Sequence, residues 1–143
     1  MSKPTVVCIC GSTKFFERHY IERWKMERTG EFICLAINYI PGSFAEQIGL
    51  QGHDHFGEQL GLKELLDELH LRKIDLSEEV FVVNVGGYVG ESTQREIAYA
   101  IWQGKAVRFL EPAAGEAMLS ERAHAIGAQV ATFSQALRTG ATS

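Results

Sequence analysis

The sequence predicts an α/β protein with a doubly wound parallel sheet of four or five strands and helices on both faces. Three observations support this fold class. Short runs rich in β-branched and apolar residues alternate with longer segments whose apolar residues recur at helical spacing. Residues 80–85 are apolar apart from one asparagine, as expected of a strand that is covered on both faces. Glycines follow several of these runs, where a strand would turn into a helix.

The amino-acid composition is that of an ordinary globular protein, and we expect a single domain over residues 1–143. The chain has 143 residues, of which 45% are hydrophobic and 22% charged, which is enough apolar material for a real core. The net charge of −4 gives no basic surface for a nucleic acid polymer or an acidic membrane. No apolar run reaches the roughly 18–20 residues of a membrane span, and the first residues lack the layout of a signal peptide. We therefore expect a cytoplasmic protein.

Expected strands lie at residues 5–10, 32–37, 79–84 and 106–110, with residues 129–133 as an optional fifth. The first strand leads into a helix over residues 14–29, which carries Phe16, Tyr20 and Trp24 four residues apart and stops at Gly30. This strand–helix–strand order implies a parallel pair.

Further helices are expected at residues 60–73, from Ser92 or Thr93 to about 103, and at 114–126, where Gly127 would end the last one. Residues 38–60 show no clear period, and a loop of that length is usually functional or mobile. Its segment His53-Asp54-His55 is interpreted chiefly as solvated loop, with substrate contact from a lid or a metal triplet as the alternatives.

The most informative stretch is the third strand and the helix after it. Gly86, Gly87 and Gly90 break the strand, and Glu96 follows in what the pattern makes the first turn of a helix. In open α/β sheets, ligands bind at the carboxyl ends of strands. Glu96 is therefore our candidate catalytic residue.

Two interpretations of Glu96 remain open on local pattern. Thr93-x-x-Glu96 has the spacing of a capping box, in which the glutamate only satisfies a backbone N–H. Alternatively, the carboxylate attacks an anomeric carbon as a nucleophile. The preceding glycines favour the second interpretation, because a plain cap does not require them whereas a ligand that approaches the backbone does.

A second candidate site follows the first strand. Gly11, Ser12, Thr13 and Lys14 offer hydroxyls, backbone N–H groups at a helix start and a cation, which would suit a phosphate group. The spacings GxxxxGK[ST] and GxGxxG are both absent, so neither a P-loop nor a dinucleotide site is expected. Ser12 as a simple N-cap is the alternative.

Asp75 stands where a helix is expected to end, a position that the helix dipole disfavours for an acid. It is either a turn residue or a carboxylate that binds sugar hydroxyls or carries a proton beside Glu96. Cys8, Cys10 and Cys34 lie in expected strands and are interpreted as reduced, structural residues. We expect no metal and no other cofactor.

Several of these segments together resemble the nucleoside 2-deoxyribosyltransferase family. The resemblance covers roughly residues 5–112 and rests on CGSTK after the first strand, ID before EVFVVN, and REIAYA followed by GKAV. It implies a flavodoxin-like or Rossmann-like fold and cleavage of the N-glycosidic bond of a (deoxy)nucleoside or nucleotide, by hydrolysis or base exchange. It also implies Glu96 as the nucleophile, Asp75 as the residue that holds the sugar or base, and a homodimer or higher homo-oligomer.

The first loop is most similar to that of the deoxynucleoside 5′-monophosphate N-glycosidases, which implies phosphate binding by Ser12 and Ser92 and by Ser120 from a partner subunit. The substrate-binding set expected from the loops and the resemblance comprises Gly11, Ser12, Thr13, Lys14, Gly87, Tyr88, Gly90, Ser92 and Ser120. The chain departs from the family at Gly86-Gly87-Tyr88 and at Arg95, which leaves the substrate open.

Two rival functions remain. The same fold and glycine loops would serve a catalytically silent module that binds or senses a nucleotide, with Glu96 as a hydroxyl acceptor. A phosphoribohydrolase of the type with a PGG-x-GT-x-x-E motif ranks last, because this chain has Gly86-Gly87 and a later glutamate but neither the proline nor the Gly-Thr of that motif.

Overall fold

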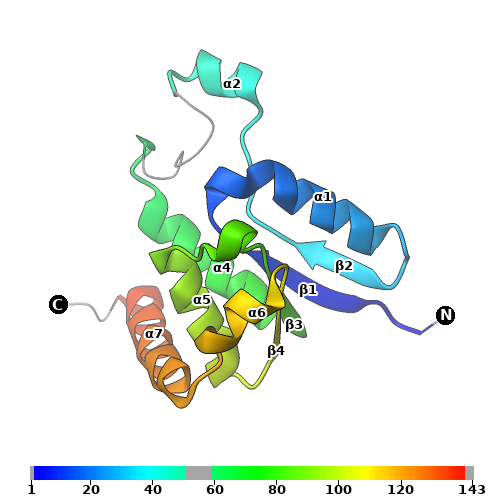
Figure 1. Ribbon diagram of the computed structural model, residues 1–143. Coiled ribbons are helices and arrows are strands. Elements are labelled where there is room, and N and C mark those ends of the chain that lie inside the picture. Colours follow the sequence, from blue (N-terminus) through cyan, green and yellow to red (C-terminus); the bar gives the residue numbers. More distant parts are fainter. Residues whose placement is uncertain (1, 51–58, 141–143) are drawn as a thin grey trace.

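The computed structural model describes residues 2–50 and 59–140. It is an α/β fold whose single sheet has four strands, all parallel, in the order β2-β1-β3-β4. The strands are β1 (Thr5–Cys10), β2 (Phe32–Leu35), β3 (Glu79–Val82) and β4 (Ala106–Phe109). The doubly wound parallel sheet expected from the sequence is confirmed, and Figure 1 shows the helices packed around it.

Six α-helices and three short 3₁₀ turns connect and follow the strands within the described residues. The α-helices are α1 (Phe16–Glu27), α2 (Gly42–Gln47), α4 (Lys63–Asp75), α5 (Glu91–Trp102), α6 (Pro112–Gly115) and α7 (Glu121–Thr139). The 3₁₀ turns are η1 (Thr13–Phe15), η2 (Val85–Gly87) and η3 (Glu116–Met118). The expected loop over residues 38–60 thus contains α2, while His53, Asp54 and His55 lie outside the described residues.

The chain reverses its direction across the sheet between β1 and β3. From β1 it crosses to β2 on one side, and later it returns to β3 on the other side of β1 and continues to β4. The loops that leave β1 and β3 therefore diverge at neighbouring carboxyl ends, which is where open α/β sheets bind their ligands.

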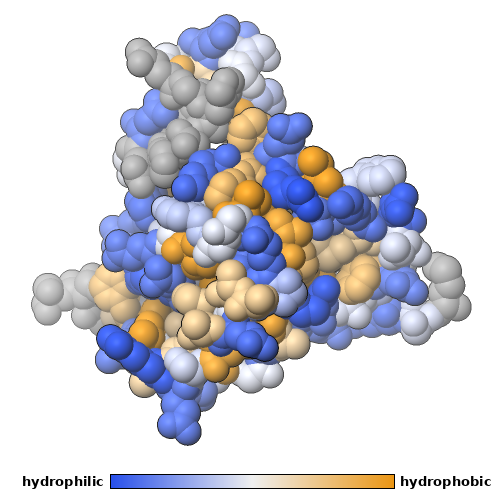
Figure 2. Space-filling model, viewed as in Figure 1, coloured by the Kyte–Doolittle hydropathy of each residue, from blue (hydrophilic) through white to orange (hydrophobic). Residues whose placement is uncertain are grey.

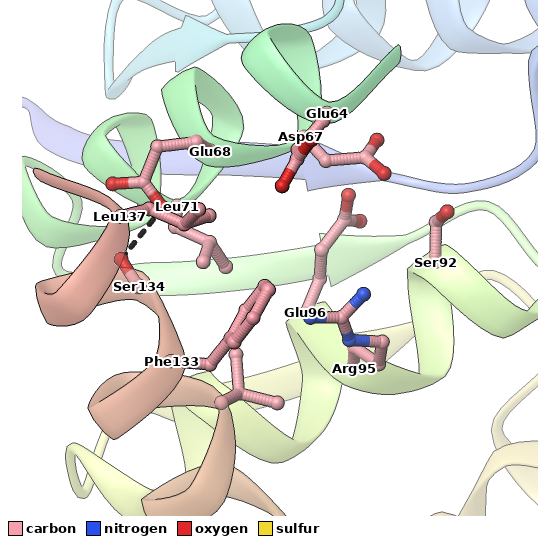
Figure 3. A pocket seen from close by; sticks show the side chains of 11 residues that line it. Glu64, Asp67, Glu68, Leu71, Ser92, Arg95, Glu96, Phe133, Ser134 and Leu137 are labelled. Carbon is pink, nitrogen blue, oxygen red and sulfur yellow. Dashed lines mark hydrogen bonds between the residues drawn. The ribbon is translucent and has the colours of Figure 1, made fainter. Parts of the chain in front are cut away.

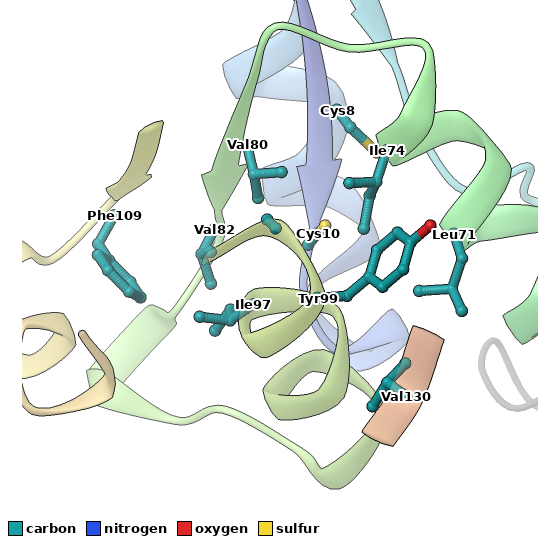
Figure 4. Packing of buried hydrophobic residues seen from close by; sticks show 11 residues of the cluster. Cys8, Cys10, Leu71, Ile74, Val80, Val82, Ile97, Tyr99, Phe109 and Val130 are labelled. Carbon is teal, nitrogen blue, oxygen red and sulfur yellow. The ribbon is translucent and has the colours of Figure 1, made fainter. Parts of the chain in front are cut away.

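The two faces of the sheet carry separate cores because side chains alternate along each strand. Val7 and Ile9 of β1 pack with residues that include Met26 of α1. Cys8 and Cys10 face the other way and pack with residues of α4, α5 and α7, as Figure 4 shows. Figure 2 shows apolar residues in the middle of one molecular face, with hydrophilic residues around them.

The optional fifth strand and the expected helix end at Gly127 are both wrong. Residues 121–139 form one helix of 19 residues, whose buried positions Ala123, Gly127, Val130 and Ser134 follow a helical period. The helix has a glycine at position 127 because α5 passes very close there: a Cβ would lie 2.1 Å from the carbonyl oxygen of Ala98. Packing against α5, rather than local β propensity, decides the structure of 129–133.

The helix after β3 begins earlier than expected. Gly90 is the N-cap and Glu91 the first residue of α5, with no side-chain cap hydrogen bond. Thr93 and Glu96 are both buried on the inner side of the helix, so they do not form a capping box. Glu96 consequently lies in the second turn of α5 rather than the first.

Candidate active site

Glu96 lies on the wall of a cavity bounded by α4, α5 and α7. The residue is 6% exposed, and its side chain projects from α5 toward α4, as Figure 3 shows. Among the described residues its Oε2 atom has no hydrogen-bond partner. This Oε2 atom lies 3.8 Å from Nε2 of His70, on the inner side of the residue. The cavity has a volume of about 50 Å³, or about 460 Å³ when the open solvent around it is included.

The rest of the cavity wall is acidic and hydroxyl-bearing on one side and apolar on the other. Glu64, Asp67 and Glu68 of α4 line it together with Ser92 and Phe133 among others. Asp67 accepts a hydrogen bond from Lys63 Nζ at 2.6 Å, and the same Nζ donates to Ser92 Oγ at 2.8 Å. This wall offers acceptors for hydroxyl groups, and its acidic residues outnumber its cation, Arg95.

Burial has a strong effect on the charge of Glu96. Loss of solvation raises the pKa of Glu96 to about 7, against the attraction of His70, which lowers it. The neighbouring charge of Asp67 also raises this pKa. Near neutral pH the carboxyl group is therefore poised between its two protonation states, as is typical of catalytic carboxylates.

A fully buried cluster surrounds the inner side of Glu96. Nε2 of His70 lies 3.8 Å from Oε2 of Glu96, 3.4 Å from Sγ of Cys10 and 3.5 Å from Sγ of Cys8. Burial itself lowers the pKa of His70, but Glu96 and Cys8 outweigh it and raise that pKa to about 9. The hydrogen bond with Cys10 lowers the pKa of Cys8 to about 5, and the same bond raises the pKa of Cys10 well above its ordinary value.

Among the described residues, Cys8, Cys10 and His70 also have donor atoms within 4.8 Å of one another, a spacing of the kind that metal centres show. Their side chains are already at hydrogen-bond distance from each other. These contacts satisfy the imidazole and the two sulfurs without an ion. The adjacency of the two cysteines follows from their spacing on one strand, whereas no local pattern connects them with His70, which is 60 residues from Cys10 and 62 from Cys8.

The two glycine-containing loops meet at the carboxyl ends of β1 and β3. Lys14 Nζ lies 3.3 Å from the centre of the Tyr88 ring, and the rings of Phe15 and Tyr88 pack edge to face. Ser12 caps η1 by accepting a hydrogen bond from the Lys14 N–H at 3.3 Å. The structural role expected for Ser12 is thus observed, while a phosphate role stays a prediction.

Gly11 is the tightest point of the first loop. Its φ of +153° is one that residues with a side chain rarely adopt, and a Cβ there would lie 2.8 Å from the Val83 carbonyl oxygen and 2.9 Å from His19 Nε2. His19 is buried, and burial lowers its pKa to about 4. Gly11 thus packs the end of β1 directly against β3 and a neutral imidazole.

The second loop is fixed by a clip that sequence reasoning missed. The buried side chain of Asn84 donates to the Glu111 carbonyl at 3.0 Å and accepts from the Glu111 N–H at 2.8 Å. The Glu111 carboxylate in turn accepts a hydrogen bond from the Gly86 N–H. Gly87 has a φ of +79°, and Gly90 begins α5. The clip therefore orients the turn that leads to Glu96.

Asp75 does not lie at the cavity. It ends α4 as expected, but its Oδ1 accepts hydrogen bonds from Tyr99 Oη at 2.6 Å and from Gln103 Nε2 at 2.7 Å. Five residues along a helix amount to about 7.5 Å of rise and a different face. Because Asp75 comes five residues after His70, it is His70 that faces Glu96 from α4. The expectation that Asp75 acts beside Glu96 is therefore wrong.

Ser120 is exposed and is the N-cap of α7, where its Oγ accepts a hydrogen bond from the Ala123 N–H at 3.3 Å. A contribution of Ser120 to a partner's site stays a prediction.

Comparison with protein-family models, with curated proteins and with solved structures finds no match. The fold and the site define a class: an α/β protein with a doubly wound parallel sheet and a buried carboxylate at a cavity bounded by α4, α5 and α7. Within the described part of the chain, no helix combines the length and apolarity needed to cross a membrane.

Proposed function

We propose that this protein cleaves the N-glycosidic bond of a (deoxy)nucleoside or its 5′-monophosphate, with Glu96 as the nucleophile. The observation that carries the proposal is the Glu96 carboxylate itself: it is buried, lines the cavity and lies 3.8 Å from Nε2 of His70 on its inner side. The motif resemblance around Glu96 points to the same chemistry.

The reaction needs two displacements at C1′ of the sugar. In the first, a Glu96 oxygen forms a bond to C1′ while the C1′–N bond breaks; the base keeps the bonding electron pair and takes a proton from water. In the second, a water oxygen displaces the Glu96 oxygen from C1′ and loses its proton to solvent, which gives the free sugar. A second base in place of water would give base exchange.

The acidic wall supports a sugar rather than a phosphate next to Glu96. Glu64, Asp67 and Glu68 can accept hydrogen bonds from sugar hydroxyls but would repel a phosphate. A 5′-phosphate is better placed at Ser12 and Lys14, in the loop that follows Cys10. We also propose a cytoplasmic homodimer, in which the exposed Ser120 reaches a neighbouring site.

The experiment is incubation of the protein with a panel of nucleosides and 5′-monophosphates, followed by chromatographic detection of free base. Glu96→Gln keeps the size of the side chain and removes the nucleophile, so it should abolish base release. With a 2′-fluorinated substrate, mass spectrometry should find a sugar adduct on the peptide that contains Glu96. Base release that survives in Glu96→Gln would refute this mechanism.

The alternative is a nucleotide-binding module without turnover. The observation in its favour is the low exposure of Glu96, 6%, which suits a hydrogen-bond acceptor as well as a nucleophile. Calorimetric binding of a nucleotide without base release or adduct formation would favour this alternative.

A further inference from the structure

The buried side of Glu96 contains the groups that would control its charge. Three atoms surround Nε2 of His70 within 4 Å: Sγ of Cys10 at 3.4 Å, Sγ of Cys8 at 3.5 Å and Oε2 of Glu96 at 3.8 Å. Cys8 and Cys10 are fully buried, and His70 is nearly so. Neither cysteine serves the reaction proposed above, and nor does His70.

A carboxylate in this position needs a cation, because burial alone favours its neutral form. The nearby basic side chains have other partners. Lys63 is bonded to Asp67 and Ser92, Lys73 donates to the Ala36 carbonyl at 2.7 Å, and Arg95 stands over the Phe133 ring. Among the described residues, His70 is the basic group that pairs with Glu96.

We infer that His70 is a positioning residue that favours the ionised form of Glu96, and that Cys8 and Cys10 hold the imidazolium in place for it. This inference rests on the proposed function and assigns three further residues to the same site. The Nε2–H of the imidazolium donates a hydrogen bond shared between the two sulfurs on the strand side, and a negative charge on this cysteine pair stabilises the imidazolium. Glu96 then ionises at a lower pH than burial alone would allow, which makes its carboxylate available for attack.

The other titratable groups around His70 do not replace this arrangement. His19 of η1–α1 is neutral because burial lowers its pKa, and Lys73 on the same helix as His70 opposes the imidazolium charge. The charges of Cys8 and of Asp67 on α4 oppose the ionisation of Glu96, and His70 is the group that offsets them. Glu96 and Cys8 are the groups that favour a charged His70.

The first test needs no substrate. Nitrogen-15 NMR of the His70 imidazole should show the doubly protonated ring at pH 7 in the unmodified protein. Glu96→Gln should lower the pKa of His70 by about one unit or more, the size expected when a close buried charge is removed. Cys34→Ser is the matched control, because Cys34 lies on the opposite face of the sheet, and it should leave the His70 signals unchanged. A neutral His70 at pH 7 would overturn the inference.

The second test uses base release. His70→Gln removes the cation and keeps a polar group near the Nε2 position. It should lower kcat by roughly tenfold at neutral pH and move the acid limb of the pH–rate profile upward by about one unit, with KM little changed. Cys10→Ser should show a smaller shift in the same direction, and Cys34→Ser none. An unmoved acid limb in His70→Gln would contradict the inference.

Two outcomes separate this inference from its alternatives. Stoichiometric zinc in the purified protein that disappears in Cys8→Ser and Cys10→Ser would mean that a metal, not a proton, joins these residues, and the inference would be wrong. A charged His70 that depends on Glu96, in a protein that releases no base from any substrate, would overturn the proposed function and leave the ion pair established.

Discussion

Gly127→Ala is the sharpest probe of how α7 is held against α5. The added methyl group would lie 2.1 Å from the Ala98 carbonyl oxygen and 2.6 Å from Trp102 Cβ, roughly an ångström closer than van der Waals contact. Both neighbours are parts of a packed helix, so α7 must move away. Such overpacking costs about 1–3 kcal/mol, and contact with backbone places this case in the upper half of that range.

The same substitution also gains helix propensity. Replacing a helix-interior glycine by alanine contributes about 0.5–1 kcal/mol, so the net loss should be about 1–2.5 kcal/mol. For a chain of this length that corresponds to a fall in Tm of roughly 4–10 °C. Movement of α7 also shifts Val130 and Phe133, which line the cavity, and activity should fall with stability.

Differential scanning calorimetry measures this effect directly. Ala125→Gly is the control, because Ala125 is exposed on the same helix and its replacement changes only helix propensity. It should lower Tm by roughly 2–4 °C, from a loss of about 0.5–1 kcal/mol. If Gly127→Ala melts at or above the Tm of the unmodified protein, the close approach of α5 and α7 is not what requires glycine.

Three further predictions concern stability and substrate binding. Asn84→Ala removes both hydrogen bonds to the Glu111 backbone, and urea unfolding should show a loss of about 2–4 kcal/mol because buried groups are left unpaired; an unchanged midpoint would mean that the clip carries no stability. The pKa of His70 is raised on folding to about 9, so its contribution to stability is complete below its ordinary value of 6.5 and is lost as pH rises toward 9, whereas the lowered pKa of Cys8, about 5, acts in the opposite sense; between pH 6.5 and 9 the Tm should therefore change less favourably in the unmodified protein than in His70→Gln, and the same pH dependence in both would contradict the assignment. Lys14→Ala should raise KM for a 5′-monophosphate by about tenfold and leave KM for the matching nucleoside unchanged, since Lys14 would meet only the phosphate; equal changes for both substrates would place the phosphate elsewhere.

The sheet could be predicted from the sequence because its signals are local. β1 has the expected bounds, and β3 and β4 each start at the expected residue. Continuous apolar runs that end in glycine leave few alternatives to a buried parallel strand.

The predictions were wrong where contacts between residues far apart in the sequence determine the secondary structure. Residues 129–133 have strand-like composition, yet α5 holds them in a helix, and Gly127 serves close packing rather than termination. Because α5 begins at Glu91, Glu96 lies in the second turn of the helix instead of the first, and Thr93 is not the N-cap that a capping box requires.

The site was predictable in part. Glu96 and the two glycine loops stand out locally, and the structure brings both loops together. Of the expected substrate-binding residues, however, it is Ser92 that lines the cavity with Glu96. His70 carries no such signal: within its own helix it is one buried residue among others, and only the packing of α4 on β1 and α5 gives it Cys8, Cys10 and Glu96 as neighbours. Asp75 was the acid visible in the sequence, but its helix turns it toward Tyr99.

The two outer strands of the sheet limit how copies of this chain can associate. β2 and β4 are four residues long each, so they present few free backbone groups on which another chain could extend the sheet. Self-association would instead have to use helix surfaces. The solvent side of α4 and the residue before it expose Leu62, Leu65, Leu66 and Leu69, which makes this leucine face the first place to introduce a charge when the oligomeric state is measured.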